Sequence, residues 1–342
     1  MSRWNKKRKR WLNKHSQKAK KKKYSGRKIY PVVKSEHIAR YREENKPSIV
    51  MKPPQKFSLT ENTEETMRFF MQFAQEIERK EYGKRFFIDS SEVQYATVDA
   101  IIYLIAILQN DNFNMSMNYT FSGNYPINKE ANQVYSESGF NNYVHSRMRR
   151  LPQSTSKMHI VSGIKNDPET AGGLCDFVQT SLNKTREDTI PLQKVLVELM
   201  SNVYYHAYAK NTFMAKRWYM YAEHKDDYVQ GIFVDTGQGI AKTVKTRFGE
   251  KLKRILGVDY DDAKLIKSAF SSDIFRSSTN ERHRGNGLQS VRKNVQEAIF
   301  DEFEVLSGRG RCIMPKNDDL EEIIPISHKH ILYGTLYKFV IR

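Results

Sequence analysis

Residues 233–240, with the sequence FVDTGQGI, constrain the fold more than any other part of the chain. They begin with apolar residues typical of a buried strand and end in a turn that contains Gly237 and Gly239. Because glycine adopts positive φ angles easily, the backbone can turn here and come close to a ligand. Asp235 stands at the junction, where a buried carboxylate is costly unless it meets a hydrogen-bond donor. The exocyclic amine of a purine is one such donor, although the same pattern also occurs in ordinary strand-to-loop turns.

A helix is predicted upstream, over residues 192–209. Glu198, Asn202 and His206 follow one another at intervals of four residues, so they lie in one row, one helical turn apart. An acid, an amide and an imidazole in one row would form the polar wall of a site, while a solvated helix face is the simpler interpretation. A separate apolar face supports the helix through its 3.6-residue period; it consists of Leu192, Val195, Leu196, Leu199 and Val203.

Two more segments follow downstream. Residues 282–288 (RHRGNGL) lead into a predicted helix, and a glycine turn before a helix N-terminus offers free N–H groups to an anion. A plain loop is the alternative, since a single G-x-G is common. Gly334 and Thr335 then begin a predicted strand over residues 336–341.

In this order, the four segments resemble the nucleotide-binding boxes of the GHKL ATPases, whose Bergerat fold occurs in histidine kinases, gyrase, heat-shock protein 90 chaperones, MutL and anti-sigma-factor kinases. The resemblance covers about residues 165–342 and implies an ATP-binding domain over residues 169–342. It implies an α/β fold, an α+β sandwich, in which a mixed sheet is backed by helices. ATP would lie between one layer and a mobile lid.

The resemblance also implies roles for individual residues. Asp235 would accept a hydrogen bond from the adenine amine, with Thr335 in support. Asn202 would hold Mg²⁺ against the phosphates, which suits an ion that prefers oxygen ligands. Glu198 would orient or deprotonate an attacking water or a substrate hydroxyl. The other implied ATP contacts are Gly237, Gly239 and Ile240 at the adenine pocket, Gly285, Asn286, Gly287 and Leu288 at the phosphates, and His206, whose role stays open.

The segment between Ile240 and Gly285 departs from the family pattern because it is long and basic. It would serve as a phosphate clamp or as a partner-docking surface, or else form a solvated helix. Its basic residues include Lys242, Lys245, Arg247, Lys251, Lys253 and Arg254.

The length of 342 residues suits two domains. The longest uncharged apolar run, residues 100–108, is too short to span a bilayer, and no apolar segment typical of a secretory signal follows the basic N-terminus. Cys175 and Cys312 form no metal or disulfide pattern. We therefore expect a cytoplasmic protein without a membrane partner.

Most of the net charge of +18 lies in residues 1–28, which contain no acidic residue. We expect this tail to be disordered and to bind RNA or DNA with little sequence specificity. An anionic protein, an anionic membrane surface or a solubilising role are the alternatives. The candidate nucleic-acid contacts are Lys6, Lys7, Arg8, Lys9, Arg10, Trp11, Lys20, Lys21, Lys22 and Lys23. Residues 29–55, with four prolines, are predicted to be a linker.

Residues 56–150 alternate between strand and helix patterns and predict a βαβαβα unit. Asn62 and Glu65 have the spacing of a capping box at the first helix. The predicted strands cover residues 57–59, 85–89 and 115–121, and the predicted helices cover residues 62–79, 99–108 and 129–143.

This unit resembles the STAS domains of anti-sigma-factor antagonists, on Phe87-Ile88-Asp89, the apolar helix, and residues 136–140 (SESGF). In that family a serine at the start of the apolar helix takes the phosphate. Val98 falls at or beside this position and has no hydroxyl, while Thr97 is better explained as a helix cap. The resemblance therefore implies a degenerate STAS-like module that docks on the ATPase half.

Residues 151–168 are predicted to join the two domains and to contain a short strand at residues 158–161. The ATPase half should continue with a helix over residues 170–182, strands over residues 218–223, 229–234 and 303–306, and a basic loop at residues 309–311.

These features favour an ATP-binding switch, a Mg²⁺-dependent ATPase in which ATP closes a lid over residues 241–287 and hydrolysis through Glu198 opens it. One alternative is an anti-sigma-type protein Ser/Thr kinase. A sensor histidine kinase is disfavoured because no phosphoacceptor helix precedes the ATPase half. A nucleic-acid-binding scaffold with a structural ATP site is the third alternative, and the presence of both Glu198 and Asn202 argues against a dead site. The protein partner that reads the switch, and whether the chain forms a homodimer, stay open.

Overall fold

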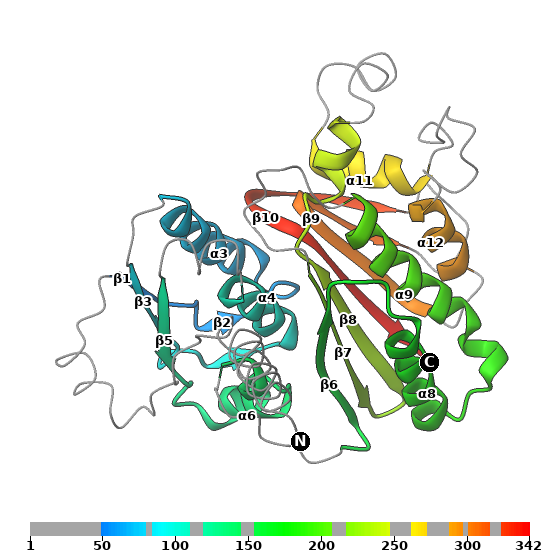
Figure 1. The fold of residues 1–342 in the computed structure, drawn as a ribbon, viewed down its shortest axis with the longest axis horizontal. Helices are drawn as coiled ribbons and strands as arrows, with labels where there is room; N and C mark the ends of the chain where they lie inside the picture. Colours follow the sequence, from blue (N-terminus) through cyan, green and yellow to red (C-terminus); the bar gives the residue numbers. More distant parts are fainter. Residues whose placement is uncertain are drawn as a thin grey trace, which may run out of the picture.

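The computed structural model describes residues 49–79, 84–109, 119–144, 154–206, 217–246, 261–271, 287–296, 300–314 and 323–342. They form an N-terminal unit (residues 49–144) and a C-terminal unit (residues 154–342), which lie side by side (Figure 1). Within these ranges, none of the helices has the length and apolar character needed to cross a membrane.

The N-terminal unit has the predicted α/β character, but it begins earlier and has more strands than predicted. Ile49–Met51 form a paired strand inside residues 29–55, which were predicted to be a linker, and the strand Tyr95–Ala96 was not predicted. The main sheet of the unit is parallel, in the order β1-β3-β5, and is formed by β1 (Ile49–Met51), β3 (Arg85–Asp89) and β5 (Thr120–Asn124). A small second sheet pairs β2 (Lys56–Phe57) with β4 (Tyr95–Ala96). The helices are α3 (Thr63–Glu78), α4 (Val98–Leu108), α6 (Lys129–Glu137) and α7 (Asn141–Val144).

Local details of this unit differ from the sequence-based predictions. The helix predicted over residues 129–143 is interrupted, because Gly139 adopts φ 93° between α6 and α7. The last strand ends at Asn124, later than predicted, and residues 115–118 lie outside the described ranges. The capping box is absent at α3, since the Asn62 side chain donates to Glu65 Oε2 (3.0 Å) and caps no backbone N–H. Thr97 is the N-cap residue of α4, but its hydroxyl donates to Asp99.

The C-terminal unit contains a five-stranded sheet in the order β6-β7-β8-β10-β9. Every neighbouring pair is antiparallel, so the expectation of a mixed sheet is wrong. For one of these pairs the reason is local: β7 and β8 are joined by two residues, and Asp226 adopts the positive φ (48°) that such hairpins require. The strands are β6 (Lys157–Gly163), β7 (Trp218–Lys225), β8 (Tyr228–Asp235), β9 (Phe300–Met314) and β10 (Ile324–Ile341).

Three strands extend well beyond their predicted limits. β10 begins at Ile324, ten residues before Gly334, where the strand was predicted to begin. β6 lies in the segment expected to join the domains, but it pairs with β7 and forms an edge of the C-terminal sheet. β9 continues through residues 309–311, which were predicted to be a basic loop, because Gly310 and Arg311 pair with β10.

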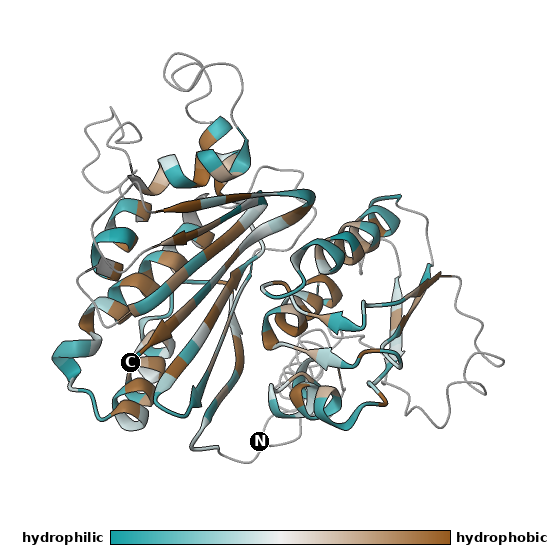
Figure 2. Cartoon of the chain, turned by 180° about the vertical axis from the view of Figure 1, so that it is seen from behind, coloured by the Kyte–Doolittle hydropathy of each residue, from teal (hydrophilic) through white to brown (hydrophobic). Residues whose placement is uncertain are grey.

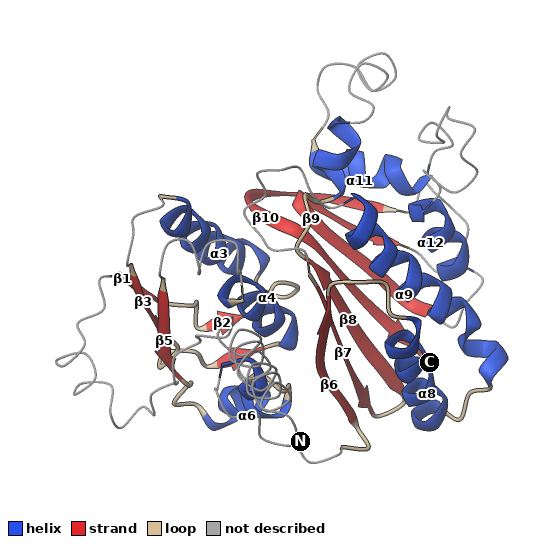
Figure 3. Cartoon of the chain, viewed as in Figure 1, coloured by secondary structure: helices blue, strands red, loops and turns tan. Residues whose placement is uncertain are grey.

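Helices cover one face of the five-stranded sheet, which we call the helical face (Figures 1 and 3). They are α8 (Pro168–Leu182), α9 (Arg186–His206), α11 (Asp262–Ser271) and α12 (Gly287–Gln296). α9 begins six residues before the predicted start. Residues 186–188 are exposed and show no apolar periodicity. Thr185 and Asp188 bond reciprocally: Thr185 N donates to Asp188 Oδ2 (2.8 Å) and Asp188 N donates to Thr185 Oγ1 (3.3 Å). This capping box is visible in the sequence as T-x-x-D.

The N-terminal unit covers the opposite face of the sheet (Figure 2). Tyr219, Val234 and Leu336 of the sheet belong to the same buried apolar cluster as the core of the N-terminal unit. The Tyr103 hydroxyl donates to Tyr333 O (2.8 Å) and accepts from Tyr333 N (2.9 Å), and Arg311 donates to Thr60 O (3.1 Å). The sheet is therefore buried on both faces, which explains the continuous apolar runs at residues 218–222 of β7 and 232–234 of β8.

Candidate functional site

Asp235 is the last residue of β8, and its side chain lies on the helical face. Successive strand residues point to opposite faces. Phe233 packs in the core of the helical face and Val234 in the core shared with the N-terminal unit, so Asp235 returns to the helical side. Thr335 of β10 pairs directly with Asp235 and shares this face, two residues before the core residue Tyr337.

The Asp235 carboxylate is only 8% exposed, and burial raises its pKa from 3.8 to about 6. Three donors oppose this effect: Gly237 N, which donates to Oδ1 (2.8 Å), and the backbone N–H and hydroxyl of Thr335. A carboxylate offers about four lone-pair positions. Asp235 therefore has acceptor capacity for one further donor, such as an amine.

The turn after Asp235 approaches the middle of β10, at Gly334, so closely that two positions require glycine. Gly239 has φ 80°, and a Cβ there would lie 2.7 Å from Ser307 Oγ. Gly334 has φ 91°, and a Cβ there would lie 2.1 Å from Asp235 O. Sequence analysis expected this role for Gly239 but did not find it for Gly334.

Ser307 of β9 is a polar residue at this site that the sequence analysis missed. It is fully buried, and its hydroxyl accepts from Ile240 N (2.9 Å) and donates to Gly334 O (2.8 Å). Ile240 begins a helical segment over residues 240–246. No local signal marks Ser307, because it follows an apolar strand like many surface serines.

On α9, Glu198 and Asn202 border the core of the helical face. Their neighbours Leu199 and Val203 are buried in that core, as the helical period predicts. Glu198 is half-buried, and burial raises the pKa of its carboxyl. Asn202 Nδ2 is buried without a hydrogen-bond partner among the described residues. An unpaired buried amide costs about 1–3 kcal/mol, so Asn202 is the kind of side chain that a bound group or water would satisfy.

The structure describes the other implied contacts only in part. Gly287 begins α12, which packs against α9, and Leu288 packs against the core of the helical face. Gly285, Asn286, the side chain of His206 and the predicted nucleic-acid contacts of the tail lie outside the described residues, as do residues 247–260 and 272–286 of the predicted lid.

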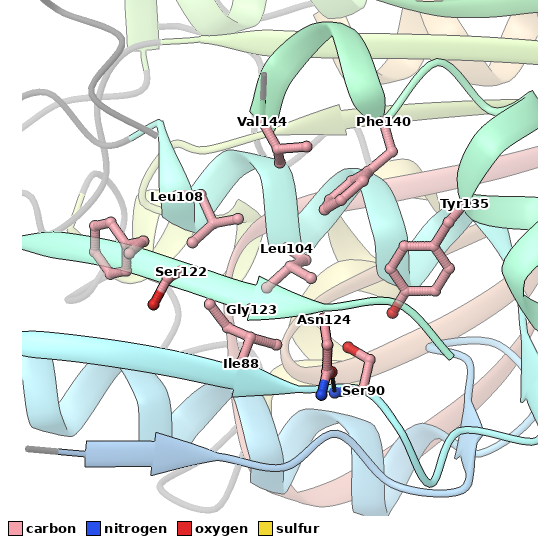
Figure 4. A pocket seen from close by; sticks show the side chains of 11 residues that line it. Ile88, Ser90, Leu104, Leu108, Ser122, Gly123, Asn124, Tyr135, Phe140 and Val144 are labelled. Atoms are coloured by element: carbon pink, nitrogen blue, oxygen red, sulfur yellow. Dashed lines mark hydrogen bonds between the residues drawn. The ribbon is translucent and has the colours of Figure 1, made fainter. Parts of the chain in front are cut away.

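A separate cavity lies inside the N-terminal unit, between the ends of β3 and β5 and helices α4 and α6 (Figure 4). Leu104, Asn124 and Tyr135 are among its lining residues. Its volume of about 20 Å³ holds about one water molecule, so this cavity is too small for a nucleotide.

Asp235, Gly239, Ser307 and Thr335 thus meet where β8 ends, on the helical face of the sheet. α9, which carries Glu198 and Asn202, packs in the same apolar core as Phe233 of β8. Comparisons with protein-family models and with curated proteins find no match for the chain.

Proposed function

We propose that the chain binds ATP on the helical face and acts as a nucleotide-dependent switch. The observation that carries the proposal is Asp235, a buried carboxylate with a raised pKa and unused acceptor capacity. Keeping such a charge buried costs about 3 kcal/mol for a pKa change of this size. A ligand that donates a hydrogen bond to the carboxylate gives a physical reason to retain it.

The residues on α9 fit the phosphate end of the same ligand. Asn202 would hold Mg²⁺ through its amide oxygen, with phosphate and water oxygens completing the shell. Glu198 would orient or deprotonate the attacking water or a substrate hydroxyl, and burial raises the pKa of its carboxyl, which makes the carboxylate a stronger base. Bound ATP would supply a transferable γ-phosphate.

A switch also needs a connection between the nucleotide site and a second part of the chain, and β9 provides one. On its helical face, β9 contacts α11, which belongs to the predicted lid: Arg309 N donates to Asp262 Oδ2 (2.9 Å). On its other face, Arg311 pairs with buried Glu304 (2.8 Å) and also bonds Thr60 of the N-terminal unit. A change in α11 would therefore act on a strand that the N-terminal unit also contacts. Coupling between the nucleotide site and the N-terminal unit also requires that ATP bind two states of the predicted lid with different affinity.

Calorimetric titration of the full chain with ATP, with and without Mg²⁺, tests the proposal. We expect saturable binding that strengthens with Mg²⁺, and GTP should bind more weakly because guanine carries a carbonyl oxygen where adenine carries its amine. Absence of saturable ATP binding would refute the proposed function.

The fate of the γ-phosphate then separates the enzymatic alternatives. The chain is incubated with γ-labelled ATP, alone and with candidate partner proteins. Free phosphate indicates an ATPase, and labelled protein indicates a Ser/Thr kinase of the anti-sigma type. Binding without turnover indicates a scaffold with a structural ATP site.

A further inference from the structure

Asp235, Thr335 and Ser307 form a row across three strands of the sheet. Thr335 of β10 pairs with Asp235 on one side and with Ser307 of β9 on the other. Because paired residues lie directly opposite one another, all three side chains share the helical face. Ser307 Oγ also lies 3.3 Å from Thr335 Oγ1.

The hydroxyl of Ser307 closes this row into a ring. The chain leaves Asp235 through the glycine turn and reaches Ile240, whose N–H donates to Ser307 Oγ. Ser307 in turn donates to Gly334 O, the residue before Thr335. The turn that follows the carboxylate is thus tied to the strand that supports it through one buried side chain.

We propose that Ser307 is a positioning residue that fixes the base-recognition surface before the nucleotide binds, and that it thereby sets the preference for adenine over guanine. The inference rests on the proposed ATP site. Adenine presents an amine donor where guanine presents a carbonyl oxygen. A carboxylate held in one position accepts a hydrogen bond from the adenine amine and repels the guanine carbonyl oxygen. If the turn is loosened, the carboxylate can move away from the guanine oxygen, and the repulsion is reduced.

One other buried serine offers the same chemistry and separates positioning from simple stability. Ser138 is buried in the N-terminal unit, and its hydroxyl donates to Tyr135 O (3.0 Å) and accepts from Phe140 N (3.3 Å). Ser138→Ala therefore removes an equivalent pair of hydrogen bonds, one donated to a backbone carbonyl and one accepted from a backbone N–H, in the other unit of the chain. It serves as the matched control.

The experiment measures the ratio of ATP to GTP affinity by calorimetry in the wild-type chain and in both variants. We expect Ser307→Ala to lower this ratio about tenfold, the effect of losing one to two buried hydrogen bonds, while Ser138→Ala leaves it within about twofold of wild type. A Ser307→Ala chain that keeps the full ratio, while wild type prefers ATP, overturns the inference and leaves the proposed function intact. A wild-type chain that binds neither nucleotide overturns both.

Hydrogen exchange on the wild-type chain tests the inference even if Ser307→Ala does not fold. The Ile240 amide should be protected already without nucleotide, because its acceptor is the Ser307 side chain. Free exchange of this amide without nucleotide, with protection only after ATP is added, would mean that the ligand forms the turn and would overturn the inference.

Discussion

Replacing Asp235 with asparagine should stabilise the folded chain at neutral pH and abolish ATP binding. The folded-state pKa is about 6 and the ordinary value is 3.8, so the folded protein binds more protons than the unfolded chain between these values. The free energy of unfolding of the wild type therefore falls as the pH rises through this window and then becomes independent of this group. The variant carries no charge at this position, so its free energy of unfolding lacks this dependence on pH.

The magnitude follows from the same two values. Burying the charge destabilises the wild type by about 1.6 kcal/mol at pH 5 and by about 3 kcal/mol at pH 8. The asparagine NH₂ lowers the free energy of unfolding of the variant by about 1–2 kcal/mol, because it replaces an oxygen that accepts a hydrogen bond from Thr335. This loss does not depend on pH. The advantage of the variant should thus increase by about 1.4 kcal/mol between pH 5 and pH 8.

Urea unfolding at the two pH values measures this difference, and titration with ATP and Mg²⁺ measures the loss of binding. Asp99→Asn is the matched control, because Asp99 is also buried but has all its acceptor positions filled. Its carboxylate accepts from Leu59 N, Thr60 N, Thr60 Oγ1, Ala100 N and the Thr97 hydroxyl. Asp99→Asn should therefore destabilise the chain by about 2–3 kcal/mol.

Two results would refute the reasoning about Asp235. A stability difference that stays constant between pH 5 and pH 8 would show that Asp235 does not titrate with a raised pKa. Undiminished ATP affinity in Asp235→Asn would show that the carboxylate does not contact the base.

Glu198→Ala should keep ATP binding and lose turnover by about 100-fold, as for a lost general base; normal phosphate release would exclude a catalytic role. Gly334→Ala should destabilise the chain by about 2 kcal/mol or more in urea, since φ is 91° and the added Cβ meets Asp235 O at 2.1 Å. Gly173→Ala, whose Cβ meets nothing within 4 Å, should be neutral or stabilising, and equal effects would contradict the close-approach argument. Deleting residues 1–28 should weaken nucleic-acid binding and its salt dependence without changing ATP affinity; a gel shift that survives the deletion would place the nucleic-acid site elsewhere.

The sequence by itself determined the features that depend on neighbours a few residues apart. The apolar period around Leu199 and Val203 identified the buried face of α9, and the glycine turn after Asp235 located the end of a strand. The T-x-x-D cap at Thr185 was equally legible and would have placed the start of the same helix. These signals are local because helical and turn geometry repeat over a few residues.

Only the tertiary structure decided which strands became neighbours. β10 lies between β8 and β9, and this order brings Ser307 and Gly334 to Asp235 from positions far along the chain. The tertiary structure also decided that the strands run antiparallel and that the N-terminal unit buries the second face of the sheet. Strand order depends on which apolar faces bury one another across the whole chain, and that long-range choice leaves no pattern in any single segment.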